Sequence, residues 1–310
     1  MLQKEQKKKI ILLAGPTASG KSELAIKLAE YYNGEIINAD SMQVYKEISI
    51  LTSKPKPKSI KNIKHHLYGF KSVREKFSTG HWLNLVKKNI KEQWDNEKTP
   101  IVVGGTGLYF KALTEGLVKI PEIPVKVRNE IRNLHKKLGQ KKFFNELVKF
   151  DPIAKNFVLS SDSHRSMRVY EVKKFTNVSL FKLIKKTKSD FKKSVFKKLF
   201  INTPKNLLDR NIENRVNVMF EEGVIEEVKK FLKMRVYREL SPNKIIGIKE
   251  IKDHINGKIS LKETKELMAI KTRQYAKRQF TWSRGQMKSW EMIYSSNTND
   301  LYKKALNKIS

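Results

Sequence analysis

Short apolar runs and helical patterns alternate along the first third of the chain. Residues 9–14 (KIILLA) form a continuous apolar run bounded by charge and glycine, which is typical of a strand buried in a parallel sheet. Residues 21–32 then place apolar side chains at helical spacing. Two further strand patterns, 34–39 (GEIINA) and 99–105 (TPIVVGG), precede and follow the helical stretch 81–94. This alternation predicts an α/β fold with helices on both faces of a parallel sheet.

The pattern changes in the middle of the chain. Residues 122–195 contain amphipathic helical pieces and no convincing strand, so we expect a smaller all-helical insert domain there. The α/β core domain then consists of residues 1–121 and 196–310, in which residues 198–204 (KLFINTP) are a further strand candidate. Helical patterns occupy residues 125–138, 141–150, 211–234 and 261–282.

Charge changes this picture of an ordinary α/β protein. The chain has 65 lysines and arginines against 31 aspartates and glutamates, which gives a formal charge of +34. Such a positive field attracts polyanions, and nucleic acid is the leading candidate partner. The alternative is an AT-rich coding sequence that has enriched lysine, asparagine and isoleucine everywhere, so that the excess has no functional meaning.

The composition also excludes several classes of site. Cysteine is absent, which rules out disulfides, thiolate catalysis and cysteine-based zinc sites. The six histidines are scattered except for His65 and His66, so we expect no dedicated metal cage. No apolar window of about 18 residues is present, and the opening MLQKEQKKK lacks an apolar signal core. We therefore expect a cytoplasmic protein without a membrane partner.

A phosphate-binding motif follows the first apolar run. The octapeptide GPTASGKS fits G-x-x-x-x-G-K-[ST] at every defined position and lies between a predicted strand and a predicted helix. In such a loop the backbone N–H groups point at phosphate oxygens, the lysine contacts terminal oxygens, and the serine hydroxyl helps to hold Mg²⁺. The alternative is a glycine-rich turn without a ligand. The predicted phosphate-binding residues are Gly15, Pro16, Thr17, Ala18, Ser19, Gly20, Lys21 and Ser22.

The motif does not identify the phosphate ester. A phosphoryl-transfer enzyme adds a second acidic magnesium site, whereas the third predicted strand ends in Gly104, Gly105 and Thr106. A guanine-reading N-K-x-D motif is also absent, so kinase and GTPase functions are disfavoured. Ligands of open α/β sheets bind at the carboxyl ends of the strands, where Asp40, Gln43 and Thr106 should gather. Asp40 could accept a proton there; a magnesium ligand or a helix N-cap are its alternatives.

Six sequence blocks in a fixed order carry a specific resemblance. GPTASGKS is followed by DSMQVYK at 40–46, SKP at 53–55, HHL at 65–67, VGGTGLYFKAL at 103–113 and TRQYAKRQFTW at 272–282. Together they resemble the tRNA dimethylallyltransferase family, the bacterial tRNA isopentenyltransferases, over nearly the whole chain. The resemblance implies a P-loop NTPase-like fold. It also implies transfer of a dimethylallyl group from dimethylallyl diphosphate to N6 of the adenosine on the 3′ side of the anticodon (position 37), in tRNAs that read codons beginning with U.

The resemblance assigns roles within the site. The loop and Mg²⁺ would stabilise the departing diphosphate, Asp40 would take a proton from the adenine amino group, and Thr106 would align the reactants. Arg215 matches a family arginine near the diphosphate; a helix salt bridge with Glu221 or a neighbour is its alternative. Four positions depart from the family pattern: Ile248 stands for tyrosine, Leu51 for glycine, Asn211 for arginine and Asn217 for aspartate. None lies in the phosphate loop, so we expect activity to survive.

The substrate adenosine is stacked within the anticodon stem-loop, so the enzyme must extrude it. Residues 272–284 interleave aromatic and basic side chains, which suits stacking on bases and contact with phosphates. Solvated helix faces are the ordinary explanation of such basic residues. The resemblance implies contacts with tRNA by Asp40, Ser41, Met42, Gln43, Thr106, Arg128, His164, Arg165, Ser166, Met167, Arg168, Lys244, Gly247, Lys249, Lys277, Arg278, Gln279, Trp282 and Arg284.

Two other functions stay open at this stage. A P-loop nucleotide or nucleoside kinase would use ATP and ignore RNA, whereas a nucleotide-switched RNA-binding protein would bind RNA without transferring a group. Only a prenyltransferase needs dimethylallyl diphosphate and tRNA together. We expect a monomer, because one tRNA on one active site requires no partner subunit.

Overall fold

The computed structural model describes residues 8–56, 60, 62–294 and 297–309, so most of the basic opening MLQKEQKKK lies outside the described residues. The chain divides into two compact units. Unit 1 comprises Met1–Thr114 and Phe191–Ser310, and unit 2 comprises Glu115–Asp190. Each unit has its own core and is described by itself.

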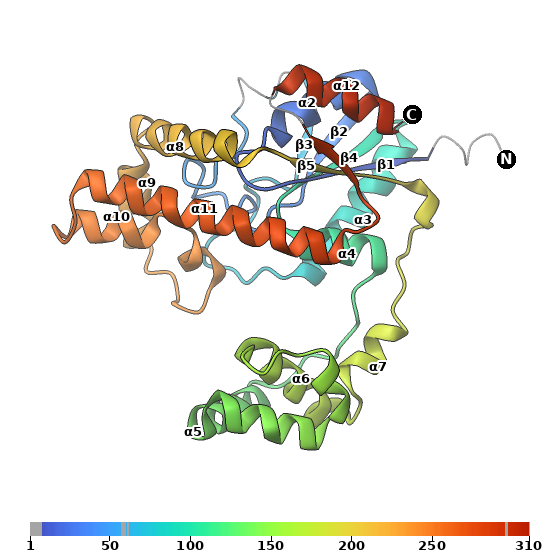
Figure 1. Cartoon of the computed structure of the whole chain (residues 1–310), viewed down its shortest axis with the longest axis vertical. Helices are drawn as coiled ribbons and strands as arrows, with labels where there is room; N and C mark the ends of the chain where they lie inside the picture. The colour runs from blue at the N-terminus through green and yellow to red at the C-terminus, as the bar shows by residue number, and fades with distance from the viewer. Residues whose placement is uncertain (1–7, 57–59, 61, 295–296, 310) are drawn as a thin grey trace. The chain divides into compact units, whose positions relative to one another are not determined.

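Unit 1 is built on a six-stranded sheet (Figure 1). The strand order is β3-β2-β4-β1-β5-β6, and each neighbouring pair is parallel. All five residues of β1 are buried, as its unbroken apolar run predicts for a central parallel strand. The strands are β1 (Ile10–Ala14), β2 (Gly34–Asn38), β3 (His65–His66), β4 (Thr99–Gly104), β5 (Phe196–Asn202) and β6 (Glu291–Tyr294).

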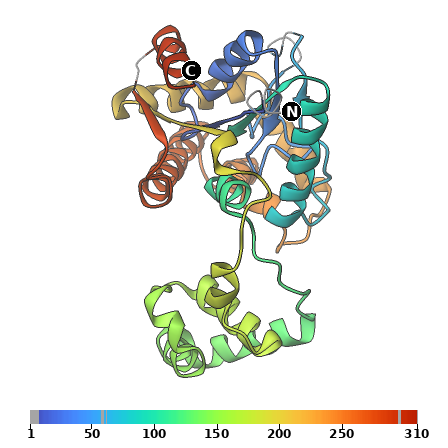
Figure 2. The ribbon, with the colours of Figure 1, turned by 90° about the vertical axis from the view of Figure 1, so that its right-hand side faces the viewer.

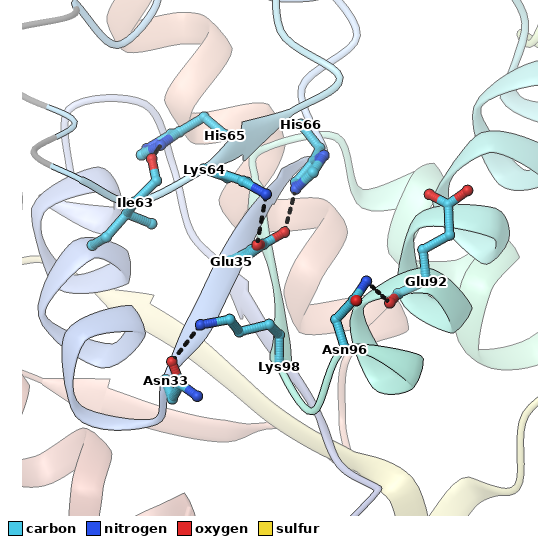
Figure 3. Close-up of polar contacts among 9 residues, drawn as sticks. All are labelled: Asn33, Glu35, Ile63, Lys64, His65, His66, Glu92, Asn96 and Lys98. Atoms are coloured by element: carbon cyan, nitrogen blue, oxygen red, sulfur yellow. Dashed lines mark hydrogen bonds and ion pairs between the residues drawn. The ribbon is translucent and has the colours of Figure 1, made fainter.

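The two edge strands are absent from the sequence prediction. β3 has only two residues, and β6 (EMIY) buries a single side chain, so neither carries a readable pattern. Figure 3 shows the His66 side chain of β3 directed at Glu35 of β2, and Nε2 of His66 lies 2.7 Å from Oε2 of Glu35. An edge strand of only two residues offers few free backbone groups for pairing with another chain.

Helices cover both faces of the sheet, as the alternating pattern predicts. α2 (Lys21–Tyr31) and α12 (Thr298–Ile309) lie side by side on one face (Figures 1 and 2), and their apolar side chains share a core with β1, β2 and β4. The Nζ atom of Lys27 donates to Asn299 Oδ1 at 2.7 Å between these two helices. α3 (Thr79–Asp95) and α4 (Gly107–Glu115) cover the opposite face.

Four further helices pack beyond the carboxyl ends of the strands. Their shared core includes Val216, Val228, Ile251 and Met268. The pattern predicted as one helical stretch over 211–234 is two helices, because Gly223 adopts a left-handed φ of 87° between them. The helices are α8 (Lys205–Glu221), α9 (Val224–Lys233), α10 (Ile248–Ile255) and α11 (Leu261–Gln286).

Unit 2 is helical, and all of its residues are described, none of them in a strand. Its longest helix, α5, has non-helical backbone angles at Gly139, between the two predicted helical pieces. Its core contains Leu147, Ala154 and Val169. Its helices are α5 (Val125–Phe150), α6 (Ser163–Thr176) and α7 (Leu180–Lys185).

Candidate active site

The loops after β2 and β4 are bonded directly to each other at the carboxyl edge of the sheet. The backbone N–H of Thr106 donates to Ala39 O at 3.1 Å, and the N–H of Ser41 donates to Thr106 Oγ1 at 3.0 Å. Asp40 lies between the two bonded residues of the β2 loop. The carboxyl edge is where open parallel sheets bind their ligands, so this junction is the natural place for chemistry.

The phosphate loop after β1 has the backbone of a cradle. Ala18 (φ 63°) and Gly20 (φ 82°) both adopt left-handed conformations, and α2 begins directly after Gly20. Ser19 Oγ is buried without a hydrogen-bond partner. An orphaned buried hydroxyl is costly unless a ligand satisfies it, and phosphate oxygens are suitable acceptors.

Two side chains of α8 reach this loop. Arg215 Nη1 donates to Thr17 Oγ1 at 2.8 Å, and Asn211 Nδ2 donates to Ala18 O at 3.1 Å. The first contact favours the diphosphate-side role of Arg215 over a salt bridge within its own helix. The second shows that the asparagine at position 211, a departure from the family pattern, still bonds to the loop.

The two cations of the loop region are close enough to affect each other. Lys21 Nζ donates to Pro16 O at 2.7 Å. Burial first and Arg215 second lower the pKa of Lys21 to about 8, whereas Asp40 acts in the opposite direction. Burial likewise lowers the pKa of Arg215, again against the attraction of Asp40. A buried pair of cations is relieved by an incoming anion, which suits a diphosphate group.

Asp40 is oriented by Asn38, a residue that sequence reasoning missed. Asn38 Oδ1 accepts from Asp40 N at 2.8 Å, and its Nδ2 donates to Asp40 O at 2.9 Å and to Leu67 O at 3.0 Å. Asp40 Oδ1 accepts from Met42 N at 2.9 Å, so the carboxylate closes a turn and does not cap an α-helix. The signal for Asn38 in the sequence is a polar residue within the apolar strand GEIINA.

An aromatic pair supports the same strand end. Trp82 Nε1 donates to Asn38 O at 2.7 Å, and the Trp82 ring stacks on Tyr109 with centroids 4.2 Å apart.

Burial first and the charge of Asp40 second raise the pKa of Tyr68, Tyr109 and Tyr275. These phenols therefore stay protonated, which makes them hydrogen-bond donors rather than bases.

Gln279 of α11 joins the phosphate loop to the loop after β4. Its Oε1 accepts from Thr17 N at 2.9 Å, and its Nε2 donates to Gly105 O at 2.9 Å. A Cβ atom on Gly105 would lie 2.2 Å from that Nε2 atom. A Cβ atom on Gly107 would lie 2.2 Å from the ring of Trp282, also on α11. Gln279, which the resemblance implies as a tRNA contact, thus bonds to both loops in this structure.

Asp40 and Arg215 line one cavity of about 250 Å³ together with Thr17. Two neighbouring cavities, of about 350 and 560 Å³, extend from Arg215 toward Lys54, and the first of them includes Ser22. Arg215 thus lines all three cavities, one of them together with Asp40 and another together with Ser22. The first cavity is also lined by Met42, Leu51, Thr52, Ser53, Met219, Lys244, Met268, Tyr275 and Arg278, among others.

The predicted RNA-contacting residues of unit 1 lie partly inside and partly outside this cavity lining. Met42, Lys244 and Arg278 belong to the lining, whereas Lys249, Lys277 and Arg284 do not. Lys277, Arg278 and Arg284 are exposed on α11, and Arg278 lies over the Tyr275 ring at 5.7 Å. Lys244 is exposed, and the exposed Lys249 pairs with Asp253 at 2.6 Å. Half-buried positions of the β2 loop are Ser41, Met42 and Gln43.

Gly247 is a correction to the expected contacts, because it is buried. With φ at 104°, it packs so closely that an added Cβ would lie 2.5 Å from Leu51 Cδ1 and 2.9 Å from Met268 Cε. The departure Leu51 is itself 6% exposed and fills the space over this glycine. Ile248, the other departure here, is buried in the same core, so its side chain offers RNA no surface.

Unit 2 holds the remaining predicted RNA contacts. His164 and Arg165 are exposed near the start of α6, whereas Met167 and Arg168 are half-buried, with Arg168 3.3 Å from Glu171. Ser166 is a second correction: it is fully buried, and its hydroxyl donates to Asp162 O at 2.7 Å, so it cannot contact RNA in this conformation. Arg128 Nε is buried without a hydrogen-bond partner.

The described part of the chain shows neither a metal-binding cluster nor a membrane-spanning helix. Within them no cluster of three or more His, Cys, Asp or Glu side chains has the geometry to hold a metal ion. Among the helices that the structure describes, none is both long and apolar enough to cross a membrane.

Proteins of known name resemble this chain over most of its length. A tRNA dimethylallyltransferase of Pelagibacter ubique (strain HTCC1062) is 54% identical over 286 residues, which cover 92% of this chain and 91% of that protein. The full-length tRNA isopentenylpyrophosphate transferase of Bacillus halodurans has a similar structure, with a TM-score of 0.67, 28% identity and 97% of each chain covered. A eukaryotic dimethylallyltransferase acting on tRNA gives a TM-score of 0.81 at 27% identity, covering 97% of this chain and 77% of that one.

The family model described as IPP transferase matches residues 43–286. The match begins just after Asp40, so it is independent of the phosphate loop, and it extends through α11. The family model matches residues 43–286, and a relative is 54% identical over 92% of this chain, so the chain belongs to the IPP transferase family.

Proposed function

We propose that this chain is a tRNA dimethylallyltransferase. It transfers the dimethylallyl group of dimethylallyl diphosphate to N6 of the adenosine at position 37, next to the anticodon, in tRNAs that read codons beginning with U. Family membership and the names of the relatives support this assignment. We also propose a cytoplasmic monomer, because tRNA is the substrate and one tRNA on one active site requires no partner subunit.

A single observation carries the proposal: Asp40 and Arg215 line the same cavity beside the phosphate loop. A kinase would need an acidic residue to hold a second metal ion near the transferred phosphoryl group. Here the carboxylate of Asp40 lines the cavity together with Arg215 and Thr17, where it suits an amine nucleophile. A proton acceptor beside anion-binding groups fits transfer of carbon from a diphosphate to nitrogen.

The proposed transfer exchanges a carbon–oxygen bond of the donor for a carbon–nitrogen bond of the adenosine. The N6 nitrogen forms a bond to C1 of the prenyl group while the C1–O bond breaks, and the diphosphate leaves with the electron pair. Asp40 accepts the proton that N6 releases, with its orientation fixed by Asn38. The amides of the loop, Lys21 and Arg215 stabilise the negative charge that grows on the leaving group. Thr106, bonded to the Ser41 backbone, fixes the loop on which Asp40 lies.

The residues of the loop fit a diphosphate with Mg²⁺. Ser22 lines a cavity with Arg215, and the unpartnered hydroxyl of Ser19 is available to a phosphate oxygen. Ser22 would be the protein ligand, since magnesium that is bridged by phosphates needs few protein groups. Bound magnesium supplies charge neutralisation to the leaving group.

For tRNA we propose the exposed basic side chains of α11 and α6 as phosphate contacts. Lys277, Arg278 and Arg284 on α11, and His164 and Arg165 on α6, are all exposed. Tyr275, near Arg278 and inside the cavity lining, offers a ring for stacking the extruded base or its neighbour.

One incubation tests the function. Purified protein, dimethylallyl diphosphate, Mg²⁺ and bulk tRNA are combined, the tRNA is digested, and the nucleosides are weighed by mass spectrometry. We expect N6-dimethylallyladenosine with the wild-type chain. Asp40→Ala should abolish most turnover and leave tRNA affinity nearly unchanged, because it removes the proton acceptor but few phosphate contacts. ATP consumption without RNA would indicate a kinase, and tRNA binding without any mass increase would indicate a binding protein.

A further inference from the structure

The turn at residues 49–53 forms one wall of the candidate active site. Leu51, Thr52 and Ser53 line the cavity that contains Asp40 and Arg215. Ser53 also lines both neighbouring cavities, again with Arg215. The position of this turn therefore sets the width of the space on the side where the diphosphate would bind.

The turn has a backbone conformation that needs support. Ser53 adopts a φ of 50°, in the left-handed region that residues other than glycine seldom occupy. Such strain persists only where the surroundings determine the conformation. On one side Gln43 gives this support, since its Nε2 donates to Thr52 O at 2.9 Å and to Ser53 O at 3.1 Å.

Glu227 of α9 holds the other side of the turn. Its Oε1 accepts from the backbone N–H groups of Ser49 at 2.6 Å and Ile50 at 2.8 Å, and its Oε2 accepts from Leu51 N at 2.9 Å. A carboxylate has lone pairs for all three bonds, and its charge strengthens each of them. Glu227 is 176 residues from Leu51 in sequence, so this contact ties the helical layer to the cavity wall.

The neighbouring residue, Glu226, makes its contact within α9 and not with the turn. Glu226 is exposed, and its Oε1 accepts from Lys229 Nζ at 2.7 Å on the same helix. Both glutamates lie in the first turn of α9, where a negative charge favours the helix dipole equally. A comparison of the two positions therefore separates the contact with the turn from the general effect of an acid at this helix end.

We propose that Glu227 is a positioning residue for the transfer reaction. By binding three consecutive amides, its carboxylate fixes the 49–53 turn, so that the cavity wall has the correct shape before the prenyl diphosphate arrives. Glu227 acts through the turn and not on the reacting atoms. The inference rests on the proposed function, because it names the diphosphate donor as the substrate whose binding depends on this wall.

The experiment compares Glu227→Ala and Glu227→Gln with the matched control Glu226→Ala. Steady-state kinetics with separately varied dimethylallyl diphosphate and tRNA give both KM values and kcat. For Glu227→Ala we expect the KM for the diphosphate to rise about tenfold, with kcat and the KM for tRNA within about twofold of wild type. Glutamine keeps one acceptor oxygen but cannot accept from Leu51 N, so Glu227→Gln should give an intermediate KM. Glu226→Ala should match wild type.

Amide hydrogen exchange supplies a readout that needs no substrate. In Glu227→Ala the amides of Ser49, Ile50 and Leu51 should exchange faster than in Glu226→Ala, while the strands of the sheet keep their protection. The inference is overturned if the two alanine variants have the same KM for the diphosphate, whether or not exchange changes. It is also overturned if Glu227→Gln raises both KM values equally. A wild-type chain that makes no prenylated adenosine would instead refute the proposed function, and exchange would still report whether Glu227 holds the turn.

Discussion

Replacing Asn38 by alanine should damage both the stability and the chemistry of this enzyme. The side chain is fully buried and makes three hydrogen bonds, at 2.8, 2.9 and 3.0 Å, to backbone groups of Asp40 and Leu67. At about 1 kcal/mol for each lost bond, Asn38→Ala should lower the free energy of unfolding by about 3 kcal/mol. Asp40 would also lose the two bonds that fix its backbone, so kcat should fall, by about tenfold or more for a misplaced proton acceptor.

Urea denaturation followed by fluorescence measures the stability change, and nucleoside mass spectrometry measures turnover. Asn84→Ala is the control, because Asn84 is exposed on α3 and the same substitution there removes none of these bonds. It should leave the free energy of unfolding within about 0.5 kcal/mol of wild type. If Asn38→Ala behaves like Asn84→Ala in both assays, Asn38 does not orient Asp40 and the reasoning is refuted.

Two further predictions concern the loop and its support. Because the pKa of Lys21 is lowered to about 8, a diphosphate that binds above pH 8 must take up a proton at Lys21. Between pH 7 and pH 9 the affinity for inorganic pyrophosphate should therefore fall about tenfold more in wild type than in Lys21→Met. Calorimetry measures both affinities. Equal declines in the two proteins would contradict this. Gly107→Ala should cost about 1–3 kcal/mol of unfolding free energy, since its Cβ would lie 2.2 Å from the Trp282 ring. The cost should nearly vanish in a Trp282→Ala background, and additive effects in denaturation would exclude the clash.

The fold could be predicted from the sequence wherever burial imposes a strong pattern. β1, β2, β4 and β5 are apolar runs because parallel strands are covered on both faces, and they lie within a few residues of the predicted positions. β3 and β6 could not be predicted, because two residues and a single buried side chain leave no periodicity. The split between α8 and α9 depends on one glycine with a positive φ, inside a pattern that is otherwise helical.

In the candidate site, too, some residues can be predicted from the sequence and others cannot. The phosphate loop is readable because its chemistry demands glycine, lysine and serine at fixed spacing. Asn38 and Glu227 are not readable in this way, because their role arises from contacts with backbone atoms, which any sequence offers. For Asn38 these atoms belong to Asp40 and Leu67, and for Glu227 they belong to a turn 176 or more residues away. Ser166 and Gly247 are predicted as RNA contacts because they lie in matching motifs, but both are buried. A motif does not reveal which of its residues are buried in the fold.

Helix α11 brings these two kinds of residue together. Gln279 bonds to the amide of Thr17 and the carbonyl of Gly105, while Lys277 and Arg278, two residues and one residue earlier, are exposed. One turn of a single helix thus carries both the bonds to the phosphate loop and to the loop after β4, and the cations proposed to bind RNA phosphates. The two hydrogen bonds of Gln279 therefore connect the helix that bears these cations directly to the phosphate loop.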